Sequence, residues 1–323
     1  MKILVFIQND DNHINRMTLE AISGAQHLLK IFSCDSTSSI SVATFNKNSC
    51  AELEKLDLEK IILIENKKLE KYNPLYYTSA MEQLLTNNPE IEIVLFAHTY
   101  EARDWVPRLS ARLDIPFITD CIGFKECNNK PCFIRQTYQG KINNDISTVG
   151  TTLCSIQSGS FKTDNLNKGT PVIEKFSVEL ENISNTIHTE KKFKEQQGGV
   201  DLTAAEVIVS VGRGIGKEEN LPMVEELSEL LGAELGSSRP VVDYGWLAHE
   251  RQIGSSGQVV SPKLYFAIGI SGAIQHQVGM KSSNHIMSIN KDPNAPIFEI
   301  SNYAVIGDLL EIVPKVIKKL KEI

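Results

Sequence analysis

The residues best suited to chemistry follow an apolar run in the last quarter of the chain. Residues 263–270, KLYFAIGI, are typical of a buried β-strand, and Ser271 and Gly272 follow as a turn. Gln275 and His276 then fall in the first turns of a predicted helix. A strand that leads through small residues into a helix N-terminus directs backbone N–H groups at one point, where an anion can bind. This stretch therefore predicts a site for a phosphate-like group with an imidazole beside it.

A second candidate site is the glycine-rich turn at 210–220, SVGRGIGKEEN. Gly212, Gly214 and Gly216 lie between a predicted strand and a predicted helix. Glycines let the backbone curl so that several N–H groups face one anion, and Arg213 adds a permanent positive charge. The spacing is G-x-G-x-G and not the G-x-G-x-x-G of dinucleotide-binding turns. The pattern therefore fits an anion site and a tight turn with a solvated arginine equally well.

Further polar segments border the predicted strands of the same region. Ser238 and Arg239 come ahead of one strand, and the serine- and glycine-rich loop 251–262 comes ahead of another. Asn290 stands at a strand end, and Asp308 begins the last helix, where it also suits a simple N-cap. Because ligands of open α/β sheets bind at the carboxyl ends of the strands, these loops are expected to surround one ligand. A long ligand with a diphosphate and an adenosine fits such a set.

The length, charge and cysteine content of the chain favour some classes of protein over others. The chain has 323 residues, of which 41% are hydrophobic and 23% charged, enough for two globular domains. The formal net charge of −7 disfavours nucleic acid or an anionic membrane as a partner, because both attract basic surfaces. No apolar stretch approaches the roughly 18 residues of a membrane span, and we expect a cytoplasmic protein. The 6 cysteines show neither CxxC nor zinc-finger spacing, so we expect reduced thiols and no metal site.

The first part of the chain alternates apolar strands with amphipathic helices up to about residue 120, which predicts a parallel sheet with helices on both faces. Additional strands, mainly antiparallel, are expected to complete this N-terminal domain, which we place at residues 1–190. These additional strands are 132–141, 145–156 and 171–180. A stretch with few apolar residues follows and predicts a linker over 191–204.

A second α/β pattern occupies residues 205–323, the predicted C-terminal domain. It begins with a strand at 205–212 and a helix that has Pro222 near its start. The last helix, from 308 onward, places lysines near its C-terminus, as the helix dipole favours. The strands expected between these helices are 240–245, 263–270, 285–292 and 296–307. The predicted fold class is α/β with two domains, and the N-terminal parallel sheet carries added antiparallel strands.

Several stretches of the second domain resemble the α subunit of the electron transfer flavoproteins. They are SSRPVVDYG (237–245), QIGSSGQVVSPKLYFAIGISGAIQHQVGM (252–280) and SINKDPNAPIFEISNYAVIGDL (288–309), in the family's order and spacing. The first domain matches more loosely, through RDWVPRLSARLDIPFITD (103–120). The resemblance implies that the C-terminal α/β domain is an FAD-binding domain that holds the cofactor noncovalently.

The same resemblance implies partners. A β subunit would complete a heterodimer, and the family carries electrons from dehydrogenases, often acyl-CoA dehydrogenases, to a membrane quinone oxidoreductase. Some members instead take part in electron bifurcation with NADH and ferredoxin. We therefore expect an electron carrier rather than a free-standing enzyme.

Site residues follow from the resemblance by position. Those that match the family's FAD contacts are Arg213, Ser238, Arg239, Ile253, Gly254, Ser255, Ser256, Ser271, Gly272, Ala273, Ile274, Gln275, His276, Asn290, Asp308 and Leu309. Ser271 and Gly272 would cradle an FAD phosphate. Arg239 would lie beside the isoalloxazine ring, and His276, protonated or hydrogen-bonding, would face its pyrimidine edge. Such groups favour an extra electron on the ring.

One position departs from the family. The family usually has Gln-Thr where this chain has Ser255 and Ser256. Ser256 keeps a hydroxyl that could donate to flavin nitrogen N5, but it lacks the methyl group that restricts the rotamer of threonine. The resemblance therefore implies a donor to N5 whose rotamer is less restricted than that of the family's threonine.

Two other functions fit parts of the pattern. An NAD-dependent dehydrogenase could use the turn at 212–216, but the fingerprint spacing is missing, and the candidate ribose carboxylate, Glu234, follows a long helix. A non-redox regulatory module that binds adenine nucleotides is compatible with the strand-end loops. No P-loop lysine motif occurs, which disfavours ATP hydrolysis.

Overall fold

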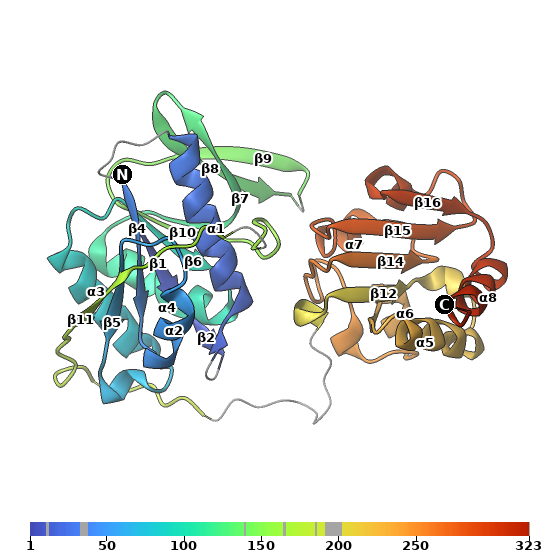
Figure 1. Cartoon of the computed structure of the whole chain (residues 1–323), viewed down its shortest axis with the longest axis horizontal. Coiled ribbons are helices and arrows are strands. Elements are labelled where there is room, and N and C mark those ends of the chain that lie inside the picture. Colours follow the sequence, from blue (N-terminus) through green and yellow to red (C-terminus); the bar gives the residue numbers. More distant parts are fainter. Residues whose placement is uncertain are drawn as a thin grey trace. The chain divides into compact units, whose positions relative to one another are not determined.

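The computed structural model describes residues 1–10, 13–32, 38–138, 140–163, 166–184, 186–190 and 202–322. These residues divide into two compact units, of which the first holds almost all of those up to 190 and the second those from 202 onward (Figure 1). Each unit has its own sheet with helices packed on it, so the α/β fold class is as predicted. Most of the predicted linker lies outside the described residues, and its last three residues, Leu202–Ala204, form a 3₁₀ helix.

The first unit is built on a nine-stranded sheet in the order β11-β5-β4-β1-β6-β10-β7-β8-β9. The strands from β11 to β7 in this order are parallel to their neighbours, and β7, β8 and β9 pair antiparallel. The strands are β1 (Lys2–Ile7), β4 (Ser39–Thr44), β5 (Lys60–Ile64), β6 (Ile93–Ala97), β7 (Phe117–Cys127), β8 (Lys130–Thr137), β9 (Ile142–Ser147), β10 (Thr152–Ile156) and β11 (Val172–Phe176).

Helices cover both faces of this sheet (Figure 1). Val5 of β1 packs in the core on the side of α1, and its neighbour Phe6 packs in the core on the side of α3 and α4. Successive strand residues thus bury opposite faces, which explains the nearly unbroken apolar runs. The helices are α1 (Arg16–Ile31), α2 (Cys50–Leu53), α3 (Pro74–Asn87) and α4 (Tyr100–Leu113), and a short hairpin joins β2 (Asn9–Asp10) to β3 (His13–Ile14).

The prediction that the added strands are mainly antiparallel is correct for β8 and β9 and wrong for β10 and β11. β10 lies between β6 and β7, parallel to both and buried along its whole length. β11 adds to the opposite edge, parallel to β5, where Lys60 pairs with Glu174 at 2.9 Å and Lys175 with Glu65 at 2.8 Å. The predicted strand 145–156 is in fact two strands, because a turn separates β9 from β10.

The second unit has a five-stranded, fully parallel sheet in the order β13-β12-β14-β15-β16. From β12 the chain adds β13 on one side and then crosses to add β14, β15 and β16 on the other. The strand order therefore reverses between β12 and β14. The strands are β12 (Val207–Val211), β13 (Glu234–Ser237), β14 (Leu264–Ile268), β15 (His285–Asn290) and β16 (Tyr303–Ile306).

The two faces of this second sheet are covered differently. α5 (Leu221–Leu230) and α8 (Leu309–Leu320) pack side by side over one face (Figure 1). The other face is covered largely by the loop that contributes Ile253 and by a 3₁₀ helix that contributes Ile297 to the core. Two short helices, α6 (Arg239–Asp243) and α7 (Ile274–Val278), follow β13 and β14 along the chain.

One predicted strand of the second unit is wrong, and another is correct only in its second half. Residues 240–245 mostly form α6, because Ser238 and Pro240 suit a helix start better than a strand, and Val241 is the buried residue of that helix. Residues 296–307 form a 3₁₀ helix, Pro296–Ile300, and only then the strand β16. In both places a proline in the first turn fixes the helical backbone angle.

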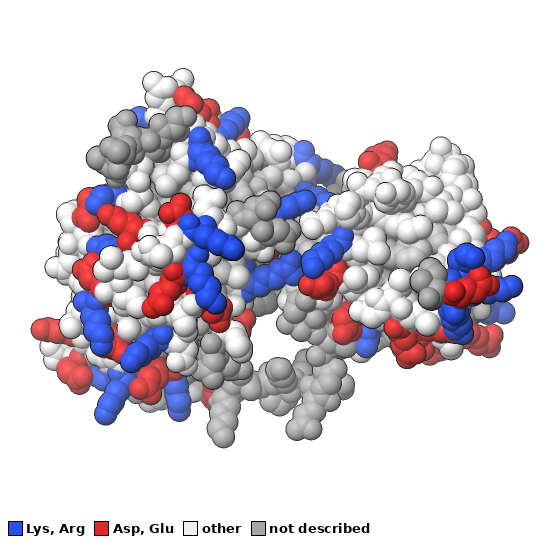
Figure 2. All heavy atoms as spheres, in the orientation of Figure 1, with Lys and Arg blue, Asp and Glu red and all other residues white. Residues whose placement is uncertain are grey.

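Lys and Arg are interspersed with Asp and Glu on the face shown in Figure 2. This face therefore does not present a purely basic surface of the kind that binds polyanions. No helix within the described ranges has the length and apolar character needed to cross a bilayer. Within the same ranges, no group of three or more His, Cys, Asp or Glu is placed to hold a metal ion.

Candidate functional site

The loops after β12 and β14 meet at the point where the strand order reverses. A β-carbon added at Gly212 would lie 2.4 Å from the carbonyl oxygen of Gly269, and one added at Gly214 would lie 2.7 Å from the Cα of Gly269. Only glycine allows the two backbones to approach so closely. Parallel sheets bind ligands at such a reversal point, at the carboxyl ends of their strands.

A cavity of about 760 Å³ opens beside these loops. Its lining comes from the carboxyl ends of several strands and from the serine-containing loop after residue 251. The lining residues are Arg213, Gly214, Ser238, Arg239, Pro240, Gln252, Ile253, Gly254, Ser255, Ser256, Gly269, Ile270, Ser271, Ala273, Gln275, His276 and Asn290. The volume is in the range of cofactor-binding sites.

All but four of the predicted site residues line this cavity. Gly272 instead packs on a backbone, since a β-carbon there would lie 2.2 Å from the amide nitrogen of Ile297. Leu309 is buried, and its side chain packs behind the loop after β14. Asp308 caps α8 by accepting from the amide of Leu310 at 2.9 Å. The fourth is Ile274, which is 42% exposed.

Five lining residues were not among the predicted contacts: Gly214, Pro240, Gln252, Gly269 and Ile270. Gly214 and Gly269 carry a detectable signal, because each lies in a glycine-containing turn directly after a buried strand. Gln252 carries none, since a glutamine at the start of a polar loop is unremarkable. Only the fold of the loop brings its side chain to the cavity.

The glycine turn at 212–216 is a tight turn and not an anion cradle. The amide of Gly212 donates to the carbonyl of Ile268 at 2.8 Å, and that of Gly214 donates to Gly269 at 3.0 Å. The amide of Gly216 donates to the carbonyl of Arg213 at 3.1 Å. These N–H groups are already satisfied by protein. The turn contributes Arg213 to the cavity and not a set of free amides.

The lining of this cavity carries two positively charged side chains and no acidic ones. Arg213 and Arg239 are both exposed at the cavity, and the lining set contains no Asp, Glu or Lys. Arg239 lies 3.4 Å, through Nε, from a carboxylate oxygen of Asp243, an exposed residue that is not part of the lining. Guanidinium groups bind phosphate oxygens in a bidentate manner. The donor set therefore fits a diphosphate.

His276 is the buried ionisable group of the cavity, at 6% exposure. Its Nε2 lies 2.9 Å from the hydroxyl of Tyr265, and its Nδ1 is buried without a hydrogen bond among the described residues. Burial lowers the pKa of His276 to about 4, against the opposing effect of the Ile253 backbone. The imidazole is neutral at pH 7. Of the two predicted forms, the hydrogen-bonding ring is favoured over the protonated one.

Asn290 holds the loop after β14 in place. Its Nδ2 donates to the carbonyl of Ile270 at 2.9 Å, and its Oδ1 accepts from the amide of Asp292 at 3.0 Å. The carboxamide thus joins the ends of β14 and β15 at the cavity wall. It retains one N–H that can donate to a ligand.

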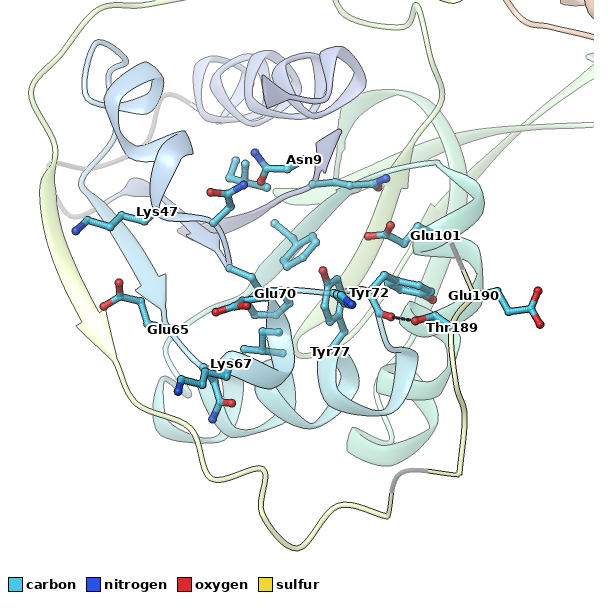
Figure 3. A pocket seen from close by; sticks show the side chains of 18 of the residues that line it. Asn9, Lys47, Glu65, Lys67, Glu70, Tyr72, Tyr77, Glu101, Thr189 and Glu190 are labelled. Carbon is cyan, nitrogen blue, oxygen red and sulfur yellow. Dashed lines mark hydrogen bonds between the residues drawn. The ribbon is translucent and has the colours of Figure 1, made fainter. Parts of the chain in front are cut away.

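The first unit has a larger cavity, of about 1250 Å³, at the carboxyl ends of β1, β4 and β5 (Figure 3). Phe6, Phe45, Tyr72 and Tyr77 supply its aromatic side chains. Its charged lining residues are Lys47, Lys67, Lys71, Glu65, Glu70, Glu101, Glu181 and Glu190. This excess of carboxylates disfavours phosphate, and the mixed charge selects no single ligand class. The cavity of the second unit is therefore the candidate functional site.

Comparison with known proteins covers both units. Residues 3–181 match the family model described as the electron transfer flavoprotein domain, and residues 201–281 match the one described as the electron transfer flavoprotein FAD-binding domain. The chain is 34% identical to electron transfer flavoprotein subunit alpha of Syntrophomonas wolfei, over 98% of both chains. It is also 34% identical to the subunit alpha of Bacillus subtilis, over 100% of this chain and 98% of the relative.

A further relative has a different name. The chain is 31% identical to subunit LctC of the lactate dehydrogenase (NAD(+),ferredoxin) of Acetobacterium woodii, over 99% of this chain and 77% of that protein. The matched FAD-binding domain includes most of the residues that line the cavity of the second unit. The chain belongs to the electron transfer flavoprotein alpha-subunit family, and its cofactor is FAD.

Proposed function

We propose that the chain pairs with a beta subunit and holds FAD in the cavity at the carboxyl ends of β12 and β14, from which electrons pass between a dehydrogenase and an accepting oxidoreductase. One observation carries the proposal. The cavity at the reversal point of the FAD-binding domain combines two arginines with no acidic lining residue. Such a lining suits a ligand that carries a diphosphate and a ring that gains negative charge.

The diphosphate would lie near Arg213 and the loop after β14. Arg213 supplies a guanidinium group, and Ser271 supplies an exposed hydroxyl at the cavity. Ala273 precedes the short helix α7 and lines the same cavity without adding bulk to it. The guanidinium group and the hydroxyl together can replace water around two phosphate groups.

The ring would lie near Arg239, Ser256 and His276. Bound FAD supplies the electron chemistry, because its ring system takes up and releases electrons. Arg239 places a permanent positive charge beside the ring, which raises the affinity for an electron. Ser256 and the neutral His276 offer hydrogen bonds, and Ile253 gives an apolar wall that excludes water.

The partners are proposed from the family. The beta subunit would complete the heterodimer, with the predicted domain at 1–190 serving partner binding and the one at 205–323 serving FAD. The electron donor would be an acyl-CoA dehydrogenase or another dehydrogenase, and the acceptor a quinone oxidoreductase. An exchange with NADH and ferredoxin systems is the second candidate for the donor and acceptor, because the name of the LctC relative contains NAD(+) and ferredoxin.

The experiment is co-expression of the chain with an electron transfer flavoprotein beta subunit from the same organism, followed by a visible spectrum and a stepwise reduction. A yellow complex that releases FAD on denaturation and takes up electrons one at a time supports the proposal. A colourless complex that binds only adenine nucleotides would support the regulatory module instead. Turnover of a small substrate with NAD alone would support the dehydrogenase.

A further inference from the structure

The loop after residue 251 is closed on itself by its backbone. The amide of Gln258 donates to the carbonyl of Gln252 at 2.8 Å, and the amide of Gly254 donates to the carbonyl of Gln258 at 3.1 Å. A β-carbon added at Gly257 would lie 2.3 Å from the carbonyl oxygen of Gln252, so the turn is too tight for a side chain there. The backbones of Gln252 and Ser256 are therefore held at a fixed separation.

The side chains of Gln252 and Ser256 meet across this turn at the cavity. Gln252 is 5% exposed, and its Nε2 donates to Oγ of Ser256 at 3.0 Å. Both residues line the cavity, and Ser256 is exposed to it. A hydroxyl oxygen that accepts a hydrogen bond keeps its own proton available to donate. The carboxamide of Gln252 thus leaves Ser256 as a donor whose open side is the cavity.

Serine needs this restraint because it lacks a methyl group on Cβ. A β-branched side chain is stiff at χ1, whereas an exposed serine moves among three staggered positions. Two of those positions would break the bond to Gln252. One hydrogen bond from a buried side chain can therefore restrict χ1 of Ser256, as the β-methyl group restricts χ1 of threonine.

We infer that Gln252 is a positioning residue that orients the hydroxyl of Ser256 toward the flavin ring. The inference rests on the proposed function, because it needs the ring to lie within reach of Ser256. A hydroxyl donates more strongly to a ring that carries an extra electron, since the acceptor is then charged. Loss of the orientation shifts the first reduction equilibrium toward the oxidised protein by about three- to tenfold. That shift corresponds to about 30–59 mV.

The test is a double-mutant cycle on the heterodimer that contains FAD. The variants are Gln252→Met, Ser256→Ala and the two combined, and the readout is the first reduction potential from a redox titration. Gln252→Met with Ser256→Thr is the rescue variant, because the β-methyl restores the restraint. Gln252→Met with Ser255→Thr is its matched control, since the same methyl is then added one residue away.

The expected result is that Gln252→Met and Ser256→Ala each lower the potential by the stated amount, and that their combination lowers it no further. Ser256→Thr restores the potential in the Gln252→Met protein, and Ser255→Thr does not. Additive effects, or no rescue by Ser256→Thr while FAD stays bound, would overturn the inference.

Folding and flavin binding are checked separately. If Gln252→Met does not fold, Gln252→Glu keeps the size of the side chain but accepts the proton of Ser256, and it should lower the potential as well. An unchanged potential in a flavin-replete Gln252→Glu protein overturns the inference. A wild-type complex whose visible spectrum shows no flavin overturns the proposed function, and the inference with it.

Discussion

The hydroxyl of Tyr265 lies 2.9 Å from Nε2 of His276, and both side chains are buried. The bond ties strand β14 to α7, the short helix whose first residues border the cavity. A neutral imidazole has only one N–H, so the bond to Tyr265 helps to decide which ring nitrogen carries the proton. Tyr265, which does not line the cavity, thereby influences whether His276 donates or accepts a hydrogen bond there.

Tyr265→Phe removes this bond and leaves Nε2 of His276 buried without a partner. We expect the second unit to lose about 1–3 kcal/mol of unfolding free energy, the usual cost of an unsatisfied buried polar group. Denaturant unfolding followed by Trp246 fluorescence in a Trp105→Phe background measures it, because Trp246 is partly buried and packs against the core of the second unit. Tyr303→Phe, at 63% exposure, is the control. Equal unfolding midpoints for the two variants would contradict the role of the bond.

The stability of the second unit should fall in mild acid. Burial lowers the pKa of His276 from 6.5 to about 4. Between these pH values the unfolded chain holds more protons than the folded one, so lowering the pH favours unfolding. The loss amounts to about 3 kcal/mol from pH 7 to pH 4. His276→Gln should flatten the pH dependence of the Trp246 transition, and an unchanged slope in that variant would assign the effect to other groups.

The first unit should respond to pH in the opposite direction. Burial raises the pKa of Glu20 from 4.5 to about 7, although the amide of Gly159 donates to its carboxylate at 2.5 Å and Arg16 also opposes the shift. Between pH 4.5 and 7 the folded chain holds more protons, so raising the pH costs about 3 kcal/mol. Trp105 fluorescence in a Trp246→Phe background reports the transition of this unit.

Glu20→Gln is the matched variant, because its side chain keeps an oxygen that can accept from Gly159. It should remove the loss of stability between pH 4.5 and 7 and leave the acid response of the second unit unchanged. A first unit whose stability still falls with rising pH in this variant would show that Glu20 is not the titrating group.

Much of the fold could be predicted from the sequence because strand and helix patterns are local. The apolar run before Ser271 predicted β14, and the lysines of the last helix predicted its C-terminal half. The position of β10 between β6 and β7 could not be predicted, because a short apolar run fits an edge and a centre equally well. At Val241 the β-branched residues suggested a strand, but Pro240 and the N-cap position of Ser238 decided for a helix.

The sequence predicts those residues of the site that stand at the ends of strands. Ser271 and Asn290 stand at the ends of predicted strands whose carboxyl ends meet, and both line the cavity. Ser238 lines the cavity too, but it follows β13, a strand that was not predicted, and it precedes α6 where a strand was expected. Gln252 reaches the cavity only because its loop closes on itself, which no local pattern reports. Asp308 fits the family's order of residues, yet its side chain caps α8 and pairs with Lys291 at 2.9 Å. Its predicted contact with FAD stays a prediction.

Arg239→Ala should lower the first reduction potential of the bound flavin, because it removes a permanent positive charge from the cavity. The expected decrease in the potential is about 30–60 mV. It corresponds to the free energy of one charge-assisted hydrogen bond, reduced because solvent screens this exposed residue. Arg239→Lys keeps the charge and should recover most of the potential. Redox titration of flavin-replete protein is the measurement, and equal potentials in the alanine and wild-type proteins would remove Arg239 from the electron-accepting environment.

The most direct test of the central claim is the FAD content of the heterodimer when the cavity at the carboxyl ends of β12 and β14 is filled. Ala273→Trp places a large side chain at the cavity, and Ile306→Trp places the same side chain on the exposed edge strand β16. We predict that Ala273→Trp loses about one equivalent of FAD relative to the wild type, because the diphosphate and a tryptophan cannot occupy the same part of the cavity, while Ile306→Trp keeps its FAD. A folded Ala273→Trp complex with the full FAD content of the wild type would contradict the account.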